Sequence, residues 1–171
     1  PSDVFIPTYK PTVKGNKKQV KRAIQAISSS KKPVVYIGGG AILANSTHLI
    51  REFVEKTGIP VVETLMARGS LEFDSPYLFG MLGMHGEYAA NMAVHEADIL
   101  VSLGARFDDR VTGRLDVFAS NAKVVHIDID PASIDKLVQA DYPIVGDLFS
   151  VLEDFLEVAD DFTFNDYSHW V

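Results

Sequence analysis

The sequence has no cysteine among its 171 residues. Disulfide bonds, cysteine-ligated zinc, iron–sulfur clusters and cysteine nucleophiles are therefore excluded, and the composition is compatible with a reducing, cytoplasmic setting. No apolar run reaches the ~18 residues that a membrane-spanning helix needs. No basic segment followed by an apolar stretch indicates a signal peptide. We therefore expect no membrane association.

Basic residues are scarce over most of the chain, and the net charge is −7. Residues 1–51 carry a net charge of +8, whereas residues 52–171 carry −15. In the basic part, lysines and an arginine alternate with Val20, Ile24 and Ile27, as on the solvent-facing side of an amphipathic helix. Because no aromatic side chains lie among these basic residues to stack on bases, we expect no nucleic-acid binding.

Two hydrophobic patterns alternate along the chain. One has the three- and four-residue spacing of amphipathic helices, and the other consists of short runs that are apolar on both faces, as in buried parallel strands. Gly58 is expected to end the second helix, and Asp147 to cap the last. Helices are predicted over residues 17–28, 46–57, 87–96, 132–138 and 148–158. Strands are predicted over residues 34–37, 61–63, 99–103, 124–129 and 144–145.

This alternation predicts an α/β fold, a three-layer, doubly wound, mostly parallel sheet of about five or six strands. Residues 1–15, with three prolines, read as an interdomain linker. Residues 16–159 are assigned to one nucleotide-binding domain and residues 160–171 to the start of a C-terminal connector. Ligands of such folds bind at the carboxyl ends of the strands, so the residues after each strand are the candidates for a site.

A glycine-rich loop, Gly38–Gly40, follows the first predicted strand. Glycines there let the backbone approach a phosphate closely. The dinucleotide fingerprint needs a third glycine where this chain has Leu43, so a simple strand-to-helix turn stays open as an alternative. Glu63 ends the second strand, near the place of the ribose-binding acid of dinucleotide folds. An NAD-binding oxidoreductase domain is therefore a second hypothesis.

The segment 104–113 (GARFDDRVTG) holds two arginines that bracket two adjacent aspartates after the third predicted strand. Arginine is suited to bidentate contact with phosphate or carboxylate, although a surface ion-pair cluster would look the same. Asp128 and Asp147 end two further strands, where a carboxylate can accept hydrogen bonds from a ribose or an adenine amine. The histidines have no metal-binding spacing, and no nucleophile motif is present. The pattern indicates a nucleotide cradle without catalytic groups.

Together these segments resemble the central domain of the large catalytic subunit of acetolactate synthase (acetohydroxyacid synthase), a thiamin-diphosphate enzyme. The most specific element is the string RFDDRVTG. The resemblance is carried by residues 36–40 (YIGGG), 64–66 (TLM), 82–86 (LGMHG), 106–113 (RFDDRVTG) and 126–131 (HIDIDP).

The resemblance implies a Rossmann-like domain that holds FAD in extended form. The adenosine side would be contacted by Gly38, Gly39, Gly40, Asp128, Ile129 and, near the adenine, Asp147. The ribityl chain and diphosphate would be lined by Gly104, Ala105, Arg106, Asp108 and Val111. The flavin would lie near Thr64, Leu65, Met66, Leu82, Gly83, Met84 and His85. Asp109 and Arg110 would face the substrate channel, with Arg110 receiving a 2-ketoacid carboxylate.

For the complete enzyme, the resemblance implies condensation of two pyruvates, or of pyruvate with 2-ketobutyrate, with loss of CO2, in the synthesis of valine, leucine and isoleucine. Thiamin diphosphate and Mg²⁺ would be bound by N- and C-terminal domains of the same polypeptide. No catalytic residue, metal site or activity is expected in this chain alone. A homodimer or larger assembly and a regulatory small subunit are the implied partners. A vestigial spacer domain that binds no ligand is a third hypothesis.

Overall fold

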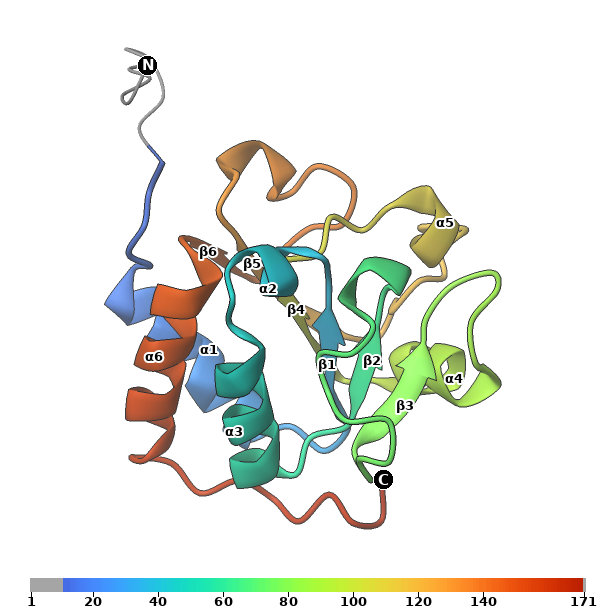
Figure 1. Cartoon of the computed structure of the whole chain (residues 1–171), viewed down its shortest axis with the longest axis horizontal. Helices are drawn as coiled ribbons and strands as arrows, with labels where there is room; N and C mark the ends of the chain where they lie inside the picture. Colours follow the sequence, from blue (N-terminus) through green and yellow to red (C-terminus); the bar gives the residue numbers. More distant parts are fainter. Residues whose placement is uncertain (1–10, 171) are drawn as a thin grey trace.

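The structure, a computed structural model, describes residues 11–170 and has one six-stranded sheet at its centre (Figure 1). Most of the expected linker, residues 1–10, lies outside the described residues. All five strand pairings are parallel, in the order β3-β2-β1-β4-β5-β6. The strands are β1 (Pro33–Ile37), β2 (Val61–Glu63), β3 (Leu78–Met81), β4 (Ile99–Leu103), β5 (Lys123–Asp128) and β6 (Tyr142–Val145).

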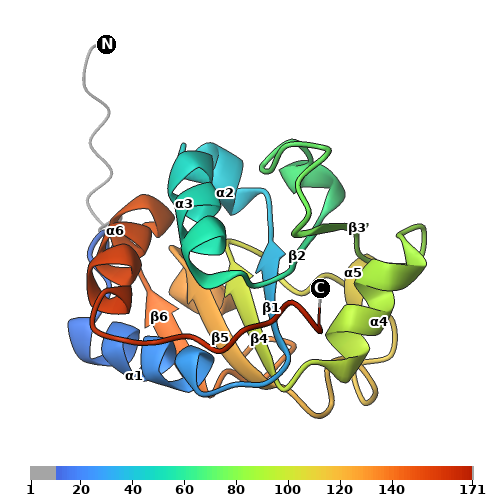
Figure 2. The ribbon, with the colours of Figure 1, turned by 90° about the horizontal axis from the view of Figure 1, so that it is seen from below.

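Helices cover both faces of the sheet, which confirms the predicted three-layer α/β fold (Figures 1 and 2). One face packs against α1 (Lys17–Ser28), α3 (Thr47–Thr57) and α6 (Leu148–Ala159). The other face packs against α4 (Tyr88–Glu96). Two helices of four residues each, α2 (Gly40–Leu43) and α5 (Asp109–Thr112), lie at the carboxyl ends of strands. No helix among these residues is both long and apolar enough to cross a membrane.

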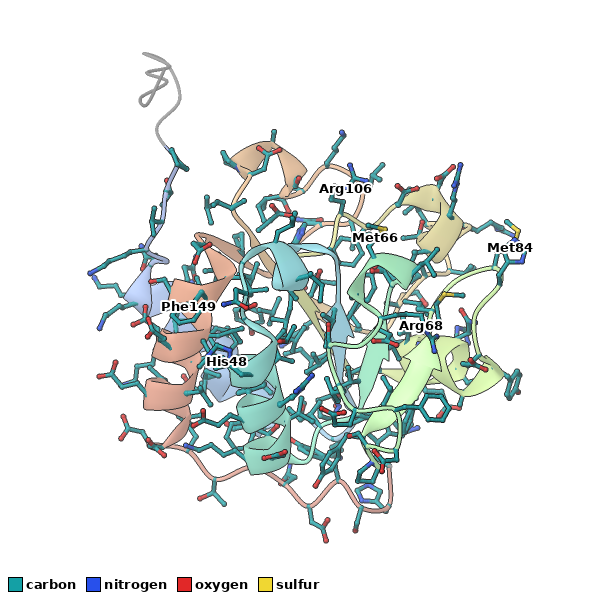
Figure 3. The ribbon with its side chains drawn as sticks, in the orientation of Figure 1. His48, Met66, Arg68, Met84, Arg106 and Phe149 are labelled. Carbon is teal, nitrogen blue, oxygen red and sulfur yellow. The ribbon has the colours of Figure 1, made fainter. Side chains whose placement is uncertain are left out.

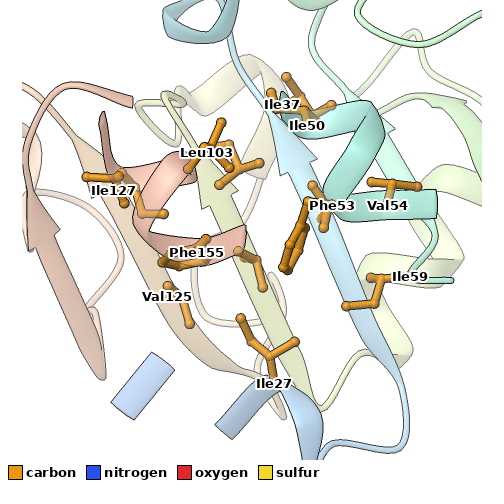
Figure 4. Close-up of a cluster of buried hydrophobic side chains, with 14 of the residues drawn as sticks. Ile27, Ile37, Ile50, Phe53, Val54, Ile59, Leu103, Val125, Ile127 and Phe155 are labelled. Atoms are coloured by element: carbon orange, nitrogen blue, oxygen red, sulfur yellow. The ribbon is translucent and has the colours of Figure 1, made fainter. Parts of the chain in front are cut away.

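The central strands are buried along their whole length. Val35 and Ile37 of β1 belong to the core under α1, α3 and α6, whereas Val34 and Tyr36 belong to the core under α4. Figure 4 shows the first of these cores, in which Phe53 of α3 and Phe155 of α6 lie 5.8 Å apart between their ring centroids. Because successive side chains enter two different cores, the strands read as continuous apolar runs.

The helix termini follow the predicted capping residues. Gly58 ends α3 with a φ of 71°, a left-handed conformation that glycine adopts without steric cost. The Asp147 side chain accepts a hydrogen bond from the Ser150 backbone N–H at 3.3 Å and so caps α6.

Two predictions of secondary structure differ from the structure. The predicted helix over 132–138 is wrong: the segment forms only a single 3₁₀ turn, Pro131–Ser133. Asp135 has a φ of 59°, and its carboxylate accepts a hydrogen bond from the Ala140 N–H at 2.7 Å, which closes a loop in place of a helix. Strand β3 lies between the predicted strand 61–63 and the predicted helix 87–96, where no strand is predicted because its short length and Gly80 weaken the pattern of a strand.

Residues 160–170 run back along the amino edge of the sheet (Figure 2). Tyr167 is buried there, and its hydroxyl donates a hydrogen bond to the Ile27 carbonyl at 3.3 Å. The Asn165 amide donates to the Ser30 carbonyl at 2.7 Å, and the Trp170 indole N–H to the Pro33 carbonyl at 3.0 Å. This segment therefore packs on the domain, while its assignment as a connector in a longer protein stays a prediction.

Truncation of Tyr167 tests whether this segment stabilises the fold. Tyr167→Ala should lower the free energy of unfolding by about 3–5 kcal/mol, because it removes a buried aromatic ring. Tyr167→Phe is the control, since it keeps the ring and loses one hydrogen bond, at a cost of about 0.5–1.5 kcal/mol. Urea unfolding followed by circular dichroism measures both. Equal stability of the Ala and Phe variants would show that the ring contributes nothing.

Candidate functional site

The six parallel strands place all predicted site segments at one edge of the sheet. Successive carboxyl ends lead into the loops that begin at Gly38, Thr64, Leu82, Gly104, Ile129 and Gly146. The direction of winding reverses between β1 and β4. Ligands of open α/β sheets bind at such a switch point. The Gly38–Gly40 loop and the Gly104–Arg106 loop meet there.

These two loops touch through their backbones. The Gly38 N–H donates to the Leu103 carbonyl at 3.0 Å, and the Gly40 N–H to the Gly104 carbonyl at 3.1 Å. A Cβ on Gly38 would lie 2.2 Å from the Gly104 carbonyl oxygen. The structure thus explains why Gly38 and Gly40 are glycines: one loop packs so closely on the other that a side chain would not fit.

Arg106 lies at the end of the second of these loops, and its side chain is exposed. Its side chain is 76% exposed, and its Nη2 lies 3.7 Å from Asp108 Oδ2. Asp108 caps α5, the helix that carries Asp109 and Arg110. All four charged residues are exposed at the same edge, so the predicted arginine–aspartate cluster exists, and its contacts with residues 11–170 leave guanidinium donors free.

Among the predicted flavin residues, Leu65, Met66, Met84 and His85 are exposed, whereas Leu82 and Gly83 are buried. Leu65, Met66 and Met84 are 69%, 73% and 80% exposed, and Figure 3 shows Met66 and Met84 along the same edge as Arg106. By contrast, Thr64 Oγ1 is buried and lacks a hydrogen-bond partner among residues 11–170. Its neighbour Glu63 is 1% exposed.

The loop 82–86 is joined to the arginine segment. The Met84 N–H donates to the Arg110 carbonyl at 3.3 Å, and a Cβ on Gly83 would lie 2.8 Å from that carbonyl oxygen. Asn91 of α4 fixes Gly83 by accepting from its N–H at 3.2 Å and donating to its carbonyl at 3.1 Å. Sequence reasoning missed Asn91, because a single amide on a helix carries no recognisable motif.

The predicted adenine-side residues lie at the ends of β5 and β6. The backbones of the two strand ends are joined, because the Gly146 N–H donates to the Asp128 carbonyl at 3.0 Å. Ile129 is 42% exposed beside them. One oxygen of Asp147 already caps α6, so its predicted contact with adenine would have to use the other.

Glu63 bears on the NAD hypothesis. Its carboxyl group is buried, and the nearest cation is Arg68, whose Nε lies 4.0 Å from Oε1. Burial raises the pKa of Glu63, and Arg68 only partly opposes that shift. A covered carboxyl group with a raised pKa is poorly placed to bind the hydroxyls of a ribose.

Comparison with known proteins decides the family. Residues 20–155 match the family described as "Thiamine pyrophosphate enzyme, central domain". The chain belongs to this family. The match covers the whole sheet and the strand-end loops of this central domain.

Two relatives of this central domain are named as acetolactate synthase large subunits. It is 51% identical to the acetolactate synthase isozyme 3 large subunit of Escherichia coli, over 92% of this chain and 28% of the relative. It is 45% identical to a protein named probable acetolactate synthase large subunit from Methanocaldococcus jannaschii, over 100% of this chain and 29% of the relative. The chain thus spans little more than a quarter of these relatives. The predicted resemblance is confirmed.

Alanine at Gly38 tests the contact between the loops. Gly38→Ala should lower the free energy of unfolding by about 1–3 kcal/mol or more, because the new Cβ would overlap backbone atoms that cannot rotate away. Gly39→Ala is the matched control: its φ of −60° suits alanine, and the atom nearest to its Cβ would be the Met66 Cβ at 3.1 Å, on an exposed residue that has room to shift. Thermal unfolding should leave the control near wild type. Equal losses would show that the loops can separate.

Glu63→Gln tests the buried carboxyl group. Because the folded-state pKa of Glu63 is raised, its contribution to stability is complete below the pKa of a free glutamate and is lost as pH rises through the folded-state pKa. At pH 7 the Gln variant should therefore be more stable by about 1 kcal/mol, the size of a polar desolvation effect. Urea unfolding from pH 4 to 8 measures the difference, with Glu55→Gln as the control for losing one negative charge. A gain that does not grow with pH would contradict this explanation.

Proposed function

We propose that this central domain binds FAD along the carboxyl edge of its sheet, as part of an acetolactate synthase large subunit. The observation that carries the proposal is the contact between the Gly38–Gly40 and Gly104–Arg106 loops at the switch point of the sheet. A dinucleotide that binds at that point needs backbone atoms that can approach it closely and a cation for its diphosphate. The names of the relatives support the enzyme class.

The residues at this edge fit the chemical groups of FAD. Arg106 has guanidinium donors free for a diphosphate. Leu65 and Met66 offer exposed apolar surface suited to a flat ring. Thr64 Oγ1 is buried without a partner within the described residues, and a hydroxyl or ring nitrogen of the cofactor would satisfy it.

In this proposal each segment contacts one part of the cofactor. The adenosine side would be contacted by Gly38, Gly39, Gly40, Asp128, Ile129 and Asp147. The diphosphate and ribityl chain would be contacted by Gly104, Ala105, Arg106, Asp108 and Val111. The ring would be contacted by Thr64, Leu65, Met66, Leu82, Gly83, Met84 and His85. When bound, FAD would supply a planar redox-active ring, whereas these residues neutralise charge, exclude water and fix the cofactor's orientation.

For the whole protein we propose condensation of two pyruvates, or of pyruvate and 2-ketobutyrate, with release of CO2, in branched-chain amino-acid synthesis. Because the net reaction transfers no electrons to an acceptor, FAD has a structural role in this proposal. Thiamin diphosphate and Mg²⁺ would be bound by other domains of the polypeptide, and Asp109 and Arg110 would face the substrate channel. The assembled enzyme would be a cytoplasmic homo-oligomer that accepts a regulatory subunit. This chain alone should show no synthase activity.

Titration with FAD, NAD and ADP tests the proposal. The chain should quench flavin fluorescence and be stabilised against heat more by FAD than by NAD. Stabilisation by NAD in preference to FAD would overturn the FAD assignment. No response to any of the three would favour a spacer domain.

Arg106→Ala tests the diphosphate contact. It should weaken FAD binding about 10- to 100-fold, since a hydrogen bond to a charged group contributes about 1.5–3 kcal/mol. Arg114→Ala is the matched control: this arginine is also 76% exposed and also pairs with an aspartate, Asp116. Fluorescence titration should give the control wild-type affinity. Equal affinities of the two variants would place the diphosphate away from Arg106.

A further inference from the structure

Two buried polar side chains lie directly beneath the Arg106 loop. His126 of β5 and Ser102 of β4 are paired in register and are both 0% exposed. His126 Nε2 lies 3.0 Å from the Ala105 carbonyl oxygen, and the Ser102 hydroxyl donates to that same oxygen at 3.3 Å. One carbonyl of the loop therefore receives two hydrogen bonds from the interior of the sheet.

The carbonyl acceptor fixes the protonation of the imidazole. Because a carbonyl oxygen can only accept, Nε2 carries a hydrogen, and in the neutral imidazole Nδ1 is then the bare nitrogen. Nδ1 is buried and has no partner among residues 11–170. Burial lowers the pKa of His126, which favours this neutral form. An imidazole so placed leaves one polar atom unsatisfied, so its polar contribution lies in the bond to Ala105.

The loop held by this bond has an unfavourable backbone conformation. Phe107 has a φ of 54°, a left-handed value that costs a residue with a side chain about 1–2 kcal/mol. Its ring is buried and meets the His126 ring edge-on, at 4.9 Å between centroids and 82° between planes. His126 thus holds the residues on both sides of Arg106, Ala105 by a hydrogen bond and Phe107 by packing.

We propose that His126, assisted by Ser102, is a positioning residue that fixes the Ala105–Phe107 backbone and so presents the Arg106 guanidinium to the diphosphate of the bound dinucleotide. This inference rests on the FAD binding proposed above. His126 itself touches no ligand in this account. It acts through the carbonyl of Ala105 and the ring of Phe107.

Two substitutions separate the hydrogen bond from the packing. His126→Phe keeps a ring against Phe107 and removes the donor. His126→Gln keeps a donor nitrogen at a similar reach and removes the ring. The Phe variant should bind FAD about tenfold more weakly, as expected for loss of one hydrogen bond that orients a charged contact, and the Gln variant should stay within about threefold of wild type. Fluorescence titration gives the affinities, and thermal unfolding gives the stabilities.

A purely structural role predicts the opposite order. The Gln variant, which loses buried ring packing, should be the less stable protein, so an affinity that follows stability would make it the weaker binder and overturn the proposal. A double-mutant cycle adds a second criterion. If His126 acts through Arg106, His126→Phe should weaken binding less than about threefold in an Arg106→Ala background. A full tenfold loss in that background would also overturn the proposal.

Amide hydrogen exchange tests the anchoring without any ligand. The Arg106, Phe107 and Asp108 amides should exchange faster in His126→Phe than in wild type, His126→Gln should restore them, and the β1 amides should be unchanged. Unchanged exchange in the Phe variant overturns the anchoring. Wild-type protein that binds no FAD overturns the proposed function and the cofactor part of this inference, whereas faster exchange would still support the anchoring.

Discussion

The backbone contact between the Gly38–Gly40 and Gly104–Ala105 loops holds the centre of the carboxyl edge together. Strands β1 and β4 are neighbours whose chains leave the sheet in different directions. The two loops pack against each other where the chains leave the sheet, so closely that there is no space for a Cβ on Gly38. The start of α2 and the backbone at Arg106 are therefore fixed relative to each other. In the proposed complex, a ligand that spans the switch point would meet a preformed backbone surface, which would lower the entropic cost of binding.

The two edges of the sheet have different physical roles. At the amino edge, polar groups find partners: Asp98 accepts hydrogen bonds from the backbone N–H groups of Lys31 and Lys32, and Trp170 donates to Pro33. At or near the carboxyl edge, within the described chain, Thr64 Oγ1 and Glu63 Oε2 are buried without a partner. Buried polar groups are normally satisfied, so the amino edge supplies stability, while the other edge retains Thr64 Oγ1 as a group that a ligand could engage.

The sequence alone predicts most of this architecture, because burial on both faces gives β1 and β4 unmistakable apolar runs and because parallel strands must end at a common edge. Prediction from the sequence fails where the pattern of a segment is short or is overridden by a single side chain. The segment 132–138 has helical spacing, but the Asp135 side chain closes a loop instead. His126 is part of a recognisable motif, yet its bond to Ala105 pairs positions 21 residues apart and only the fold reveals it. Which residues touch a cofactor stays a prediction.

The structure also bears on the choice between a cofactor domain and a mere spacer. A spacer gains nothing from a left-handed Phe107 or from a buried carboxyl at Glu63, each of which reduces stability. Nor does it need Met66 and Met84 largely exposed to solvent. All four features lie at the carboxyl edge, where the topology directs a ligand. Since strained backbone and buried polar groups often persist where function needs them, Phe107 and Glu63 favour the proposed cofactor domain over a domain that only separates its neighbours.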